Sequence, residues 1–178
     1  MKYRFTWILL TIFPGCIPFT LAAESDEQEG FRVSKTKEEW KSVLTPGQYR
    51  VLREEGTEHP HTSALLHEKR DGIFICAACK TPLFSSLTKY KSGTGWPSYY
   101  APINQTNVGT KVDRQMWSKR TEVHCAVCGG HLGHVFRDGP KSTGLRYCIN
   151  GVAMKFTPKP KNEIEQAVPT VRRKDIKN

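Results

Sequence analysis

The sequence has no long apolar run after its first 23 residues, and it has few acidic side chains. The lack of a later apolar run of about 20 residues excludes an internal helix that spans a membrane. Only 17 aspartate and glutamate residues stand against 27 lysine and arginine residues, so the formal net charge is +10. Internal repeats are missing too, apart from two Cys-x-x-Cys pairs. With 178 residues, of which 38% are hydrophobic, the chain fits one globular domain.

Residues 1–23 have the pattern of a secretory signal peptide. Lys2 and Arg4 form a basic start, the apolar run from Phe5 to Phe13 follows, and "TLAAE" supplies small residues for cleavage. We therefore expect an exported protein, periplasmic or secreted, with no stable membrane insertion after cleavage. Two alternatives stay open, an uncleaved membrane anchor and lipidation at Cys16. An exported protein meets little nucleic acid, so the positive charge does not predict a nucleic-acid partner.

Composition divides the remaining chain into three parts. Residues 24–34 are acidic and polar and are predicted to form a linker. Residues 35–158 contain the motifs and are predicted to form the folded domain. Residues 159–178 are basic, with scattered apolar residues and no period, and are predicted to be a disordered tail.

The folded domain is predicted to begin with two short helices and to continue as short strands. Thr36 and Glu39 form a capping box for the first helix, whose Val43 is expected to face the core. The second helix is expected between Thr45, a capping residue, and Gly56, which ends it. Short alternating runs between turn residues then predict a mainly β fold. These runs are "GIFIC", "MWSKRTEVHC", "GHVF", "LRYCIN" and "AMKFTP".

Two Cys-x-x-Cys pairs, at residues 76–79 and 125–128, offer four thiolates. Four thiolates match the ligand set of a closed tetrahedral zinc site, and a gap of two residues lets both sulfurs of a pair reach one metal. Disulfides and a redox function of the pairs remain alternatives, and His124 is a further candidate ligand. We predict one structural zinc ion per chain, with the ligands Cys76, Cys79, Cys125 and Cys128.

One cysteine stands outside these pairs, in the stretch "GLRYCIN". In a strand, Arg146, Cys148 and Asn150 share one face, while Tyr147 and Ile149 share the other face and can serve the core. An arginine beside a cysteine favours the thiolate, which is the nucleophilic form, and an amide can orient a water molecule or a substrate. The pattern predicts a reactive thiol, with a small buried hydrophobic residue as the plainer alternative.

Several motifs together resemble the methionine sulfoxide reductase B family. They are "SGTGWPS", "HCAVCGGHLGHVF" and "GLRYCIN", with the two Cys-x-x-Cys pairs, and the resemblance covers roughly residues 35–158. It implies a mainly β fold of two small antiparallel sheets, with short N-terminal helices and a four-cysteine zinc site away from the active site. It also implies thiol-dependent reduction of (R)-methionine sulfoxide in oxidised proteins, which are then the expected substrates.

The resemblance also implies roles for single residues. Cys148 is the nucleophile, which attacks the sulfoxide sulfur and ends as a sulfenic acid. His134 is the acid that protonates the departing oxygen, and His131 shares or supports that role. Trp96 receives the methyl group of the substrate, since an indole face suits a methyl thioether. The residues that complete the site are Arg146 and Asn150.

One position departs from the family pattern. Many members have a second, resolving cysteine within "SG-x-GWPS", where this chain has Thr94. Threonine cannot form the intramolecular disulfide, so we expect a one-cysteine enzyme whose sulfenic acid reacts with an external thiol. The expected reductant is a thioredoxin-like protein of the exported compartment or a small thiol. The competing interpretations are a zinc-ribbon module that binds a polyanion and a thiol–disulfide oxidoreductase that uses the pairs.

Overall fold

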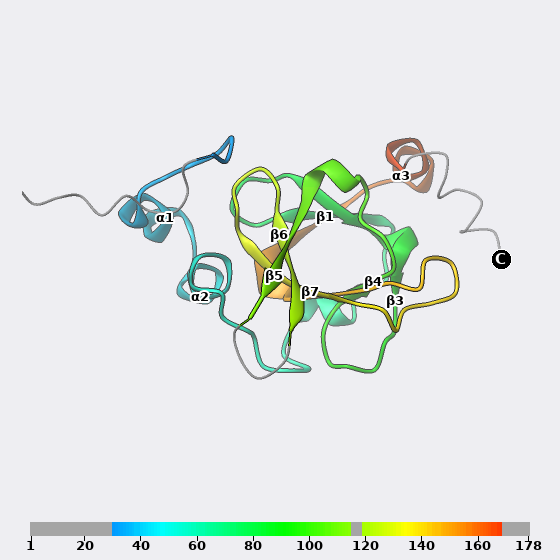
Figure 1. Ribbon diagram of the computed structural model, residues 1–178. Helices are drawn as coiled ribbons and strands as arrows, with labels where there is room; N and C mark the ends of the chain where they lie inside the picture. Colours follow the sequence, from blue (N-terminus) through cyan, green and yellow to red (C-terminus); the bar gives the residue numbers. More distant parts are fainter. Residues whose placement is uncertain (1–29, 115–118, 169–178) are drawn as a thin grey trace, which may run out of the picture.

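The computed structural model describes residues 30–114 and 119–168. The predicted signal peptide with Cys16, most of the predicted linker and the last ten residues of the predicted tail lie outside these ranges. Within the described part, no helix is long and apolar enough to cross a membrane. Figure 1 shows two short helices on one side of a group of strands and a third helix on the opposite side.

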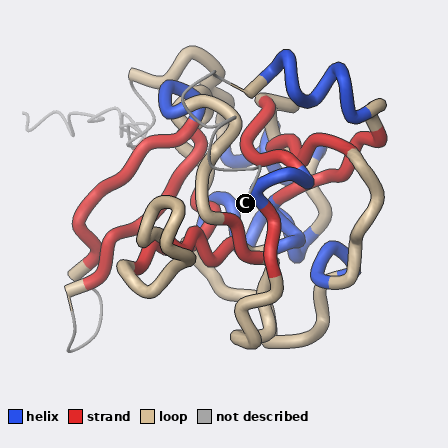
Figure 2. Tube along the Cα trace, turned by 90° about the vertical axis from the view of Figure 1, so that its right-hand side faces the viewer, coloured by secondary structure: helices blue, strands red, loops and turns tan. Residues whose placement is uncertain are grey.

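Two antiparallel sheets form the centre of the fold, which confirms the predicted mainly β class. The smaller sheet has the strand order β2-β1-β9, and the larger has the order β3-β4-β8-β7-β6-β5. Long loops join many of these short strands (Figure 2). The strands are β1 (Gly72–Cys76), β2 (Pro82–Ser85), β3 (Lys89–Tyr90), β4 (Ser98–Tyr99), β5 (Val108–Asp113), β6 (Arg120–Cys125), β7 (His131–Phe136), β8 (Arg146–Ile149) and β9 (Met154–Pro158). Short 3-10 helices are η1 (Ala64–Leu66), η2 (Ser86–Thr88), η3 (Gln105–Asn107) and η4 (Gly151–Ala153).

The first predicted helix, α1 (Lys37–Val43), begins as its capping box indicated. The Thr36 hydroxyl accepts a hydrogen bond from the N–H of Glu39, and the Glu39 carboxylate accepts one from the N–H of Thr36. The expected inward orientation of Val43 is wrong, because 57% of its surface is exposed. This short helix contacts the domain along the side of Trp40, which is fully buried.

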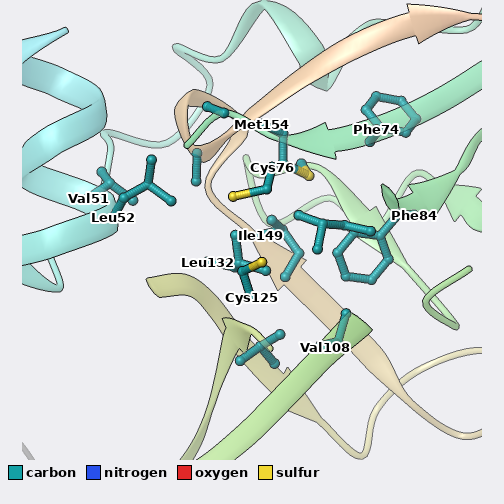
Figure 3. Packing of buried hydrophobic residues seen from close by; sticks show 14 of the residues in the cluster. Val51, Leu52, Phe74, Cys76, Phe84, Val108, Cys125, Leu132, Ile149 and Met154 are labelled. Atoms are coloured by element: carbon teal, nitrogen blue, oxygen red, sulfur yellow. The ribbon is translucent and has the colours of Figure 1, made fainter. Parts of the chain in front are cut away.

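The second predicted helix, α2 (Pro46–Glu54), also begins with a capping box and has proline at its first position. Val51 and Leu52 are buried on its inner side. Figure 3 shows both side chains pointing from the helix toward the region of Leu132 and Ile149. The helix therefore closes one end of the main core.

The beginning of the predicted tail is ordered, which corrects the sequence-based prediction of disorder. A third helix, α3 (Lys161–Ala167), follows β9 after two residues. Ile164 is fully buried, and Val168 has 1% of its surface exposed. Val168 is the residue at which the helix ends, and it packs together with Ile164 and Ile103. Two apolar residues are too short a pattern to predict such a helix from the sequence.

The end of the predicted linker also belongs to the folded domain. The N–H of Val33 donates to the carbonyl of Val127 at 3.0 Å. The ring of Phe31 meets His124 edge-on, with ring centroids 6.0 Å apart. Residues 30–34 are therefore bound to the segment that contains the second Cys-x-x-Cys pair.

The main core lies between the two sheets. Phe84 of the smaller sheet stacks on Tyr99 of the larger sheet at a centroid distance of 4.4 Å, and Phe74 meets Tyr99 edge-on at 5.1 Å. Tyr147 and Ile149 are buried in the same core, as the alternation predicted. Because successive strand residues point to opposite faces, Cys148 faces away from this core.

Candidate active site and metal centre

Cys148 lies in a row of side chains that crosses the larger sheet. In strand register it is directly opposite Ser98 of β4 on one side and His134 of β7 on the other. Tyr90 of β3 is opposite Ser98, and Glu122 of β6 is opposite His134. Directly opposed residues of antiparallel strands share a face, with Cβ atoms about 4.5–5.5 Å apart. The sheet therefore places His134 next to Cys148.

The loop before β4 contacts the sulfur of Cys148. The Thr94 hydroxyl oxygen lies 3.7 Å from Cys148 Sγ. It is also 2.9 Å from the hydroxyl of Ser92, which in turn lies 2.7 Å from that of Ser98. The position at which many family members have a second cysteine is thus in contact with the half-buried Cys148, and here it offers a hydroxyl group.

His134 is held by a carboxylate that no sequence motif indicated. His134 Nε2 lies 2.8 Å from Asp113 Oδ2, and Arg120 Nη2 donates to the same oxygen at 2.8 Å. Burial lowers the pKa of His134, the hydrogen bond to Asp113 raises it, and the net shift is downward. Asp113 stands 21 residues before His134, and only the pairing of β5, β6 and β7 brings the two together.

His131 is almost fully buried beside a second carboxylate. Its Nδ1 lies 3.0 Å from Glu122 Oε1, and Lys111 Nζ lies 3.2 Å from Glu122 Oε2. Burial acts to raise the pKa of Glu122, but contacts with His131 and Lys111 outweigh it and the pKa is lowered. The ring centroids of His131 and His134 are 5.6 Å apart. His131 can therefore support His134, while its burial leaves little surface for a substrate.

Arg146 is positioned near Cys148 by an ion pair. Its Nε and Nη2 donate to the two oxygens of Asp138 at 2.9 and 2.7 Å, and its guanidinium lies over the ring of Phe136. The hydrogen bonds to Asp138 raise the pKa of Arg146, and the charge of an ionised Cys148 adds to this effect. Asp138 thus holds the guanidinium by two of its donors.

Asn150 lies just beyond the end of the Cys148 strand, where its side chain binds backbone groups of two other segments. β8 ends at Ile149, and Asn150 is the residue that precedes η4. Its amide nitrogen donates to the carbonyl of Leu132 at 3.0 Å, and its amide oxygen accepts from the N–H of Glu58 at 2.9 Å. Asn150 therefore joins three backbone segments, and both its amide oxygen and its amide nitrogen have a backbone partner.

Glu58 connects the Trp96 loop to the chain that follows Cys148, and no sequence pattern indicated it. Its carbonyl accepts a hydrogen bond from Trp96 Nε1 at 3.1 Å. Its carboxylate accepts from the N–H groups of Gly151 at 2.5 Å and Val152 at 3.1 Å. Burial raises the pKa of this carboxyl group. Through these contacts and the one with Asn150, Glu58 fixes the indole of Trp96 relative to the end of β8.

Two glycines permit the close approaches that build the site. Gly95 has φ +92°, and a Cβ at this position would lie 2.7 Å from Pro60 Cβ. A Cβ on Gly133 would collide with the carbonyl oxygen of Cys148. Gly95 is therefore required by the packing of the Trp96 loop on Pro60, and Gly133 is required by the close approach of the Cys148 backbone.

The four cysteines of the Cys-x-x-Cys pairs meet in one cluster, with all sulfurs within 4.8 Å of one another. Cys76 and Cys128 sulfurs are 3.8 Å apart, and Cys79 and Cys125 sulfurs are 3.5 Å apart. Sulfurs around a tetrahedral zinc ion, each about 2.3 Å from it, lie about 3.8 Å apart, whereas disulfide sulfurs lie about 2.05 Å apart. The cysteines of the described part are free thiols, so the cluster fits a metal ion and not disulfides. His124 does not belong to it.

Comparison with known proteins finds relatives over most of the chain. The family model of the SelR domain matches residues 44–158. The peptide methionine sulfoxide reductase MsrB of Leptospira interrogans is 53% identical over 126 residues, which cover 71% of this chain and 96% of that protein. The MsrB of Methanosarcina mazei is 55% identical over 126 residues, 71% of this chain and 90% of that protein. Peptide methionine sulfoxide reductase B1 of Arabidopsis thaliana chloroplasts is 52% identical over 124 residues, 69% of this chain and 61% of that protein.

Proposed function

The chain belongs to the methionine sulfoxide reductase B family, and we propose that it reduces (R)-methionine sulfoxide in oxidised proteins with Cys148 as the nucleophile. Peptide-methionine (R)-S-oxide reduction is the activity that the family membership supports. The observation that carries the choice of nucleophile is the position of Cys148. It is half-buried on the outer face of the larger sheet, directly opposite His134 and outside the metal cluster.

The first step transfers the sulfoxide oxygen to Cys148. The thiolate attacks the sulfoxide sulfur and forms an S–S bond, while the sulfoxide oxygen takes up one proton. The oxygen then moves to the Cys148 sulfur, as this S–S bond and the S–O bond of the substrate break. The substrate sulfur gains two electrons and leaves as the thioether of methionine. Cys148 loses two electrons and keeps the oxygen as a sulfenic acid.

His134 is the proposed source of the proton. It lies opposite Cys148, and its Nε2 is bound to Asp113, so Nδ1 remains for the substrate. Burial lowers the pKa of His134, and the hydrogen bond to the Asp113 carboxylate opposes this effect by favouring the imidazolium, the form that can donate a proton. His131 supports His134 from its buried position.

Trp96 is the proposed wall for the methyl group of the substrate. The hydrogen bond from its Nε1 to Glu58 fixes the plane of the indole, which is half-buried. Contact between a thioether sulfur and an aromatic ring contributes about 0.3–1.5 kcal/mol. The fixed ring therefore favours a methyl sulfoxide held with its sulfur toward Cys148.

An external thiol completes the cycle, because Thr94 cannot. One thiol of the reductant attacks the sulfenic acid, forms a mixed disulfide and releases water, and a second thiol frees Cys148. A thioredoxin-like protein or a small thiol supplies both. The signal-like residues 1–23 support export to the periplasm or beyond, and such a reductant would have to be present there.

Zinc is the metal that we propose for the cysteine cluster. Four thiolates at tetrahedral spacing suit Zn²⁺, which supplies a structural cross-link without redox chemistry when it is bound. The pairs come from different sheets, since Cys76 ends β1 and Cys125 ends β6. Figure 3 shows both of these cysteines in the buried region between the sheets.

Turnover of separated sulfoxide epimers tests the function directly. The substrates are blocked methionine-R-sulfoxide and methionine-S-sulfoxide, with dithiothreitol as reductant and chromatography of the methionine product as readout. We expect turnover of the R epimer alone. A lack of R turnover by the folded, metal-loaded protein would refute the proposed activity.

We expect the substitution Thr94→Cys to give the enzyme an internal resolving thiol. Thr94 Oγ1 is 3.7 Å from Cys148 Sγ, so a thiol at this position can attack the sulfenic acid and displace water. After one turnover without reductant, peptide mapping should find a disulfide between positions 94 and 148 in this variant. Thr94→Ser is the control and should keep the sulfenic acid. A disulfide at Cys148 in the unmodified protein would contradict the one-cysteine cycle.

The substitution Asp113→Asn should move the high-pH decline of kcat/KM to lower pH. His134 donates its proton only when it is charged, so activity falls as the pH rises through its pKa. Asp113 raises that pKa against burial, so loss of its charge should lower the pKa further. Arg120→Gln is the matched variant and should move the decline to higher pH, because the Arg120 charge lowers the pKa of His134. Shifts in the same direction for both variants would exclude His134 as the acid.

A further inference from the structure

A cavity of about 440 Å³ lies beside the Trp96 loop, and Cys148 is not among its lining residues. Gly93, Gly95 and Trp96 of this loop line the cavity, while Thr94 of the same loop contacts Cys148. The cavity is therefore separated from the reacting sulfur by one loop. A peptide chain bound with its sulfoxide at Cys148 can extend past this loop into the cavity.

The lining of the cavity is positively charged. Lys69, Lys89 and Lys91 contribute to it, and Glu68 is the single carboxylate among the lining residues. Glu68 is already paired, because Arg70 Nη2 lies 2.6 Å from its Oε2 and Arg70 Nε lies 3.0 Å from its Oε1. Among the described residues, no carboxylate lies within ion-pair distance of any of the three lysines. Their charge is thus available to a ligand.

Lys89 is the most fixed of these cations. It is half-buried, and its ammonium group donates to the carbonyl oxygens of Leu66 at 2.9 Å and Glu68 at 3.0 Å. A lysine has three N–H donors, so one remains. Burial lowers the pKa of Lys89, Glu68 raises it, and the nearby charge of Lys69 lowers it again. A partly desolvated ammonium beside a second cation is stabilised by an anion.

We propose that this cavity, the lysine pocket, binds the carboxylate of an aspartate or glutamate close in sequence to the oxidised methionine. The inference rests on the proposed function. It specifies the preferred substrates as oxidised methionines with acidic residues nearby in the sequence. An extended chain advances about 3.3–3.6 Å per residue, so a side chain one to three positions from the sulfoxide can pass the loop. Trp96 lines the pocket and is also the proposed methyl wall, so one bound peptide can contact both.

Three matched peptides test the lysine pocket. Each is a blocked heptapeptide with one central methionine-R-sulfoxide, flanked by glutamate, by its neutral isostere glutamine, or by lysine. Dithiothreitol is the reductant, so that docking of a protein reductant has no influence. We expect kcat/KM to fall about two- to fivefold from the glutamate to the glutamine peptide, mainly through KM, and further for the lysine peptide. The preference should fade toward about 0.5 M salt, where exposed charges are screened.

Substitutions of lysines test whether the preference for the glutamate peptide depends on the lysine pocket. The double substitution Lys69→Gln, Lys91→Gln should lower the glutamate-to-glutamine ratio of kcat/KM at least twofold. Lys155→Gln, an exposed lysine on β9 of the other sheet, should leave the ratio unchanged. Equal kcat/KM for the glutamate and glutamine peptides would overturn the lysine pocket while the proposed function stands. Absence of turnover for all three peptides would instead overturn the proposed function.

Discussion

Replacement of Cys148 by serine is expected to abolish the reduction of methionine-R-sulfoxide without loss of the fold. A hydroxyl group is a far weaker nucleophile than a thiolate, so kcat should fall by at least about a thousandfold. Cys148 is half-buried on the face away from the core and lies outside the metal cluster, so the smaller oxygen atom disturbs little packing. The measurement is methionine formation from a blocked R-sulfoxide with dithiothreitol, together with metal content and the melting temperature.

This variant also separates the competing interpretations. A zinc-ribbon module that binds a polyanion would be insensitive to Cys148→Ser, because Cys148 is not a metal ligand. A thiol–disulfide oxidoreductase would depend on the paired cysteines, of which Cys79 is the more exposed in its pair. Sulfoxide turnover that survives in Cys148→Ser would therefore show that the nucleophile lies elsewhere. Turnover that is lost together with the metal or the fold would show that Cys148 has a structural role.

Features encoded over a few neighbouring residues could be predicted from the sequence. The capping box of Thr36 and Glu39 marks the start of α1, and the alternation of Tyr147, Cys148 and Ile149 separates the core face from the outer face of β8. In both cases the interacting groups are neighbours along the chain, so local backbone geometry decides the outcome. The exposed Val43 marks the limit of this reasoning, because a short helix buries only the side that its partner covers.

The carboxylates of the site could not be predicted in this way. Asp113 of β5 contacts His134 of β7 across the strand β6, which lies between them in the sheet. Glu122 of β6 contacts His131 of β7 because the register between these two strands is irregular. Glu58 reaches residues 150–152 from a segment about 90 positions earlier. Such contacts depend on the assembled fold, and a lone Asp or Glu in a strand or loop is more often a solvated residue. The alternation in "VGTKV" was the one available sign that Asp113 ends a strand.

The cluster of four cysteines connects the two sheets beside the aromatic core. Cys76 and Cys79 belong to the turn after β1 of the smaller sheet, whereas Cys125 and Cys128 belong to the turn after β6 of the larger sheet. Three of the four cysteines are buried, and without a metal the thiols would have one another as partners, with the Thr81 hydroxyl 3.0 Å from the Cys79 sulfur. A bound metal converts four weakly interacting groups into one cross-link between segments about 50 residues apart.

Loss of this metal should therefore destabilise the whole domain, and Cys128→Ser is the variant that tests it. A structural zinc ion contributes a large part of the folding free energy of a small domain, so the loss of one of four ligands should cost several kcal/mol. At about 2–4 °C per kcal/mol for a chain of this size, the melting temperature should fall by about 10 °C or more. The same fall is expected for the unmodified protein after treatment with a strong chelator.

Cys148→Ser is the matched control, because it removes a cysteine outside the cluster. This variant should keep one metal ion per chain and its melting temperature. A metal-free protein that melts as the metal-loaded one does would show that the aromatic core alone holds the sheets together.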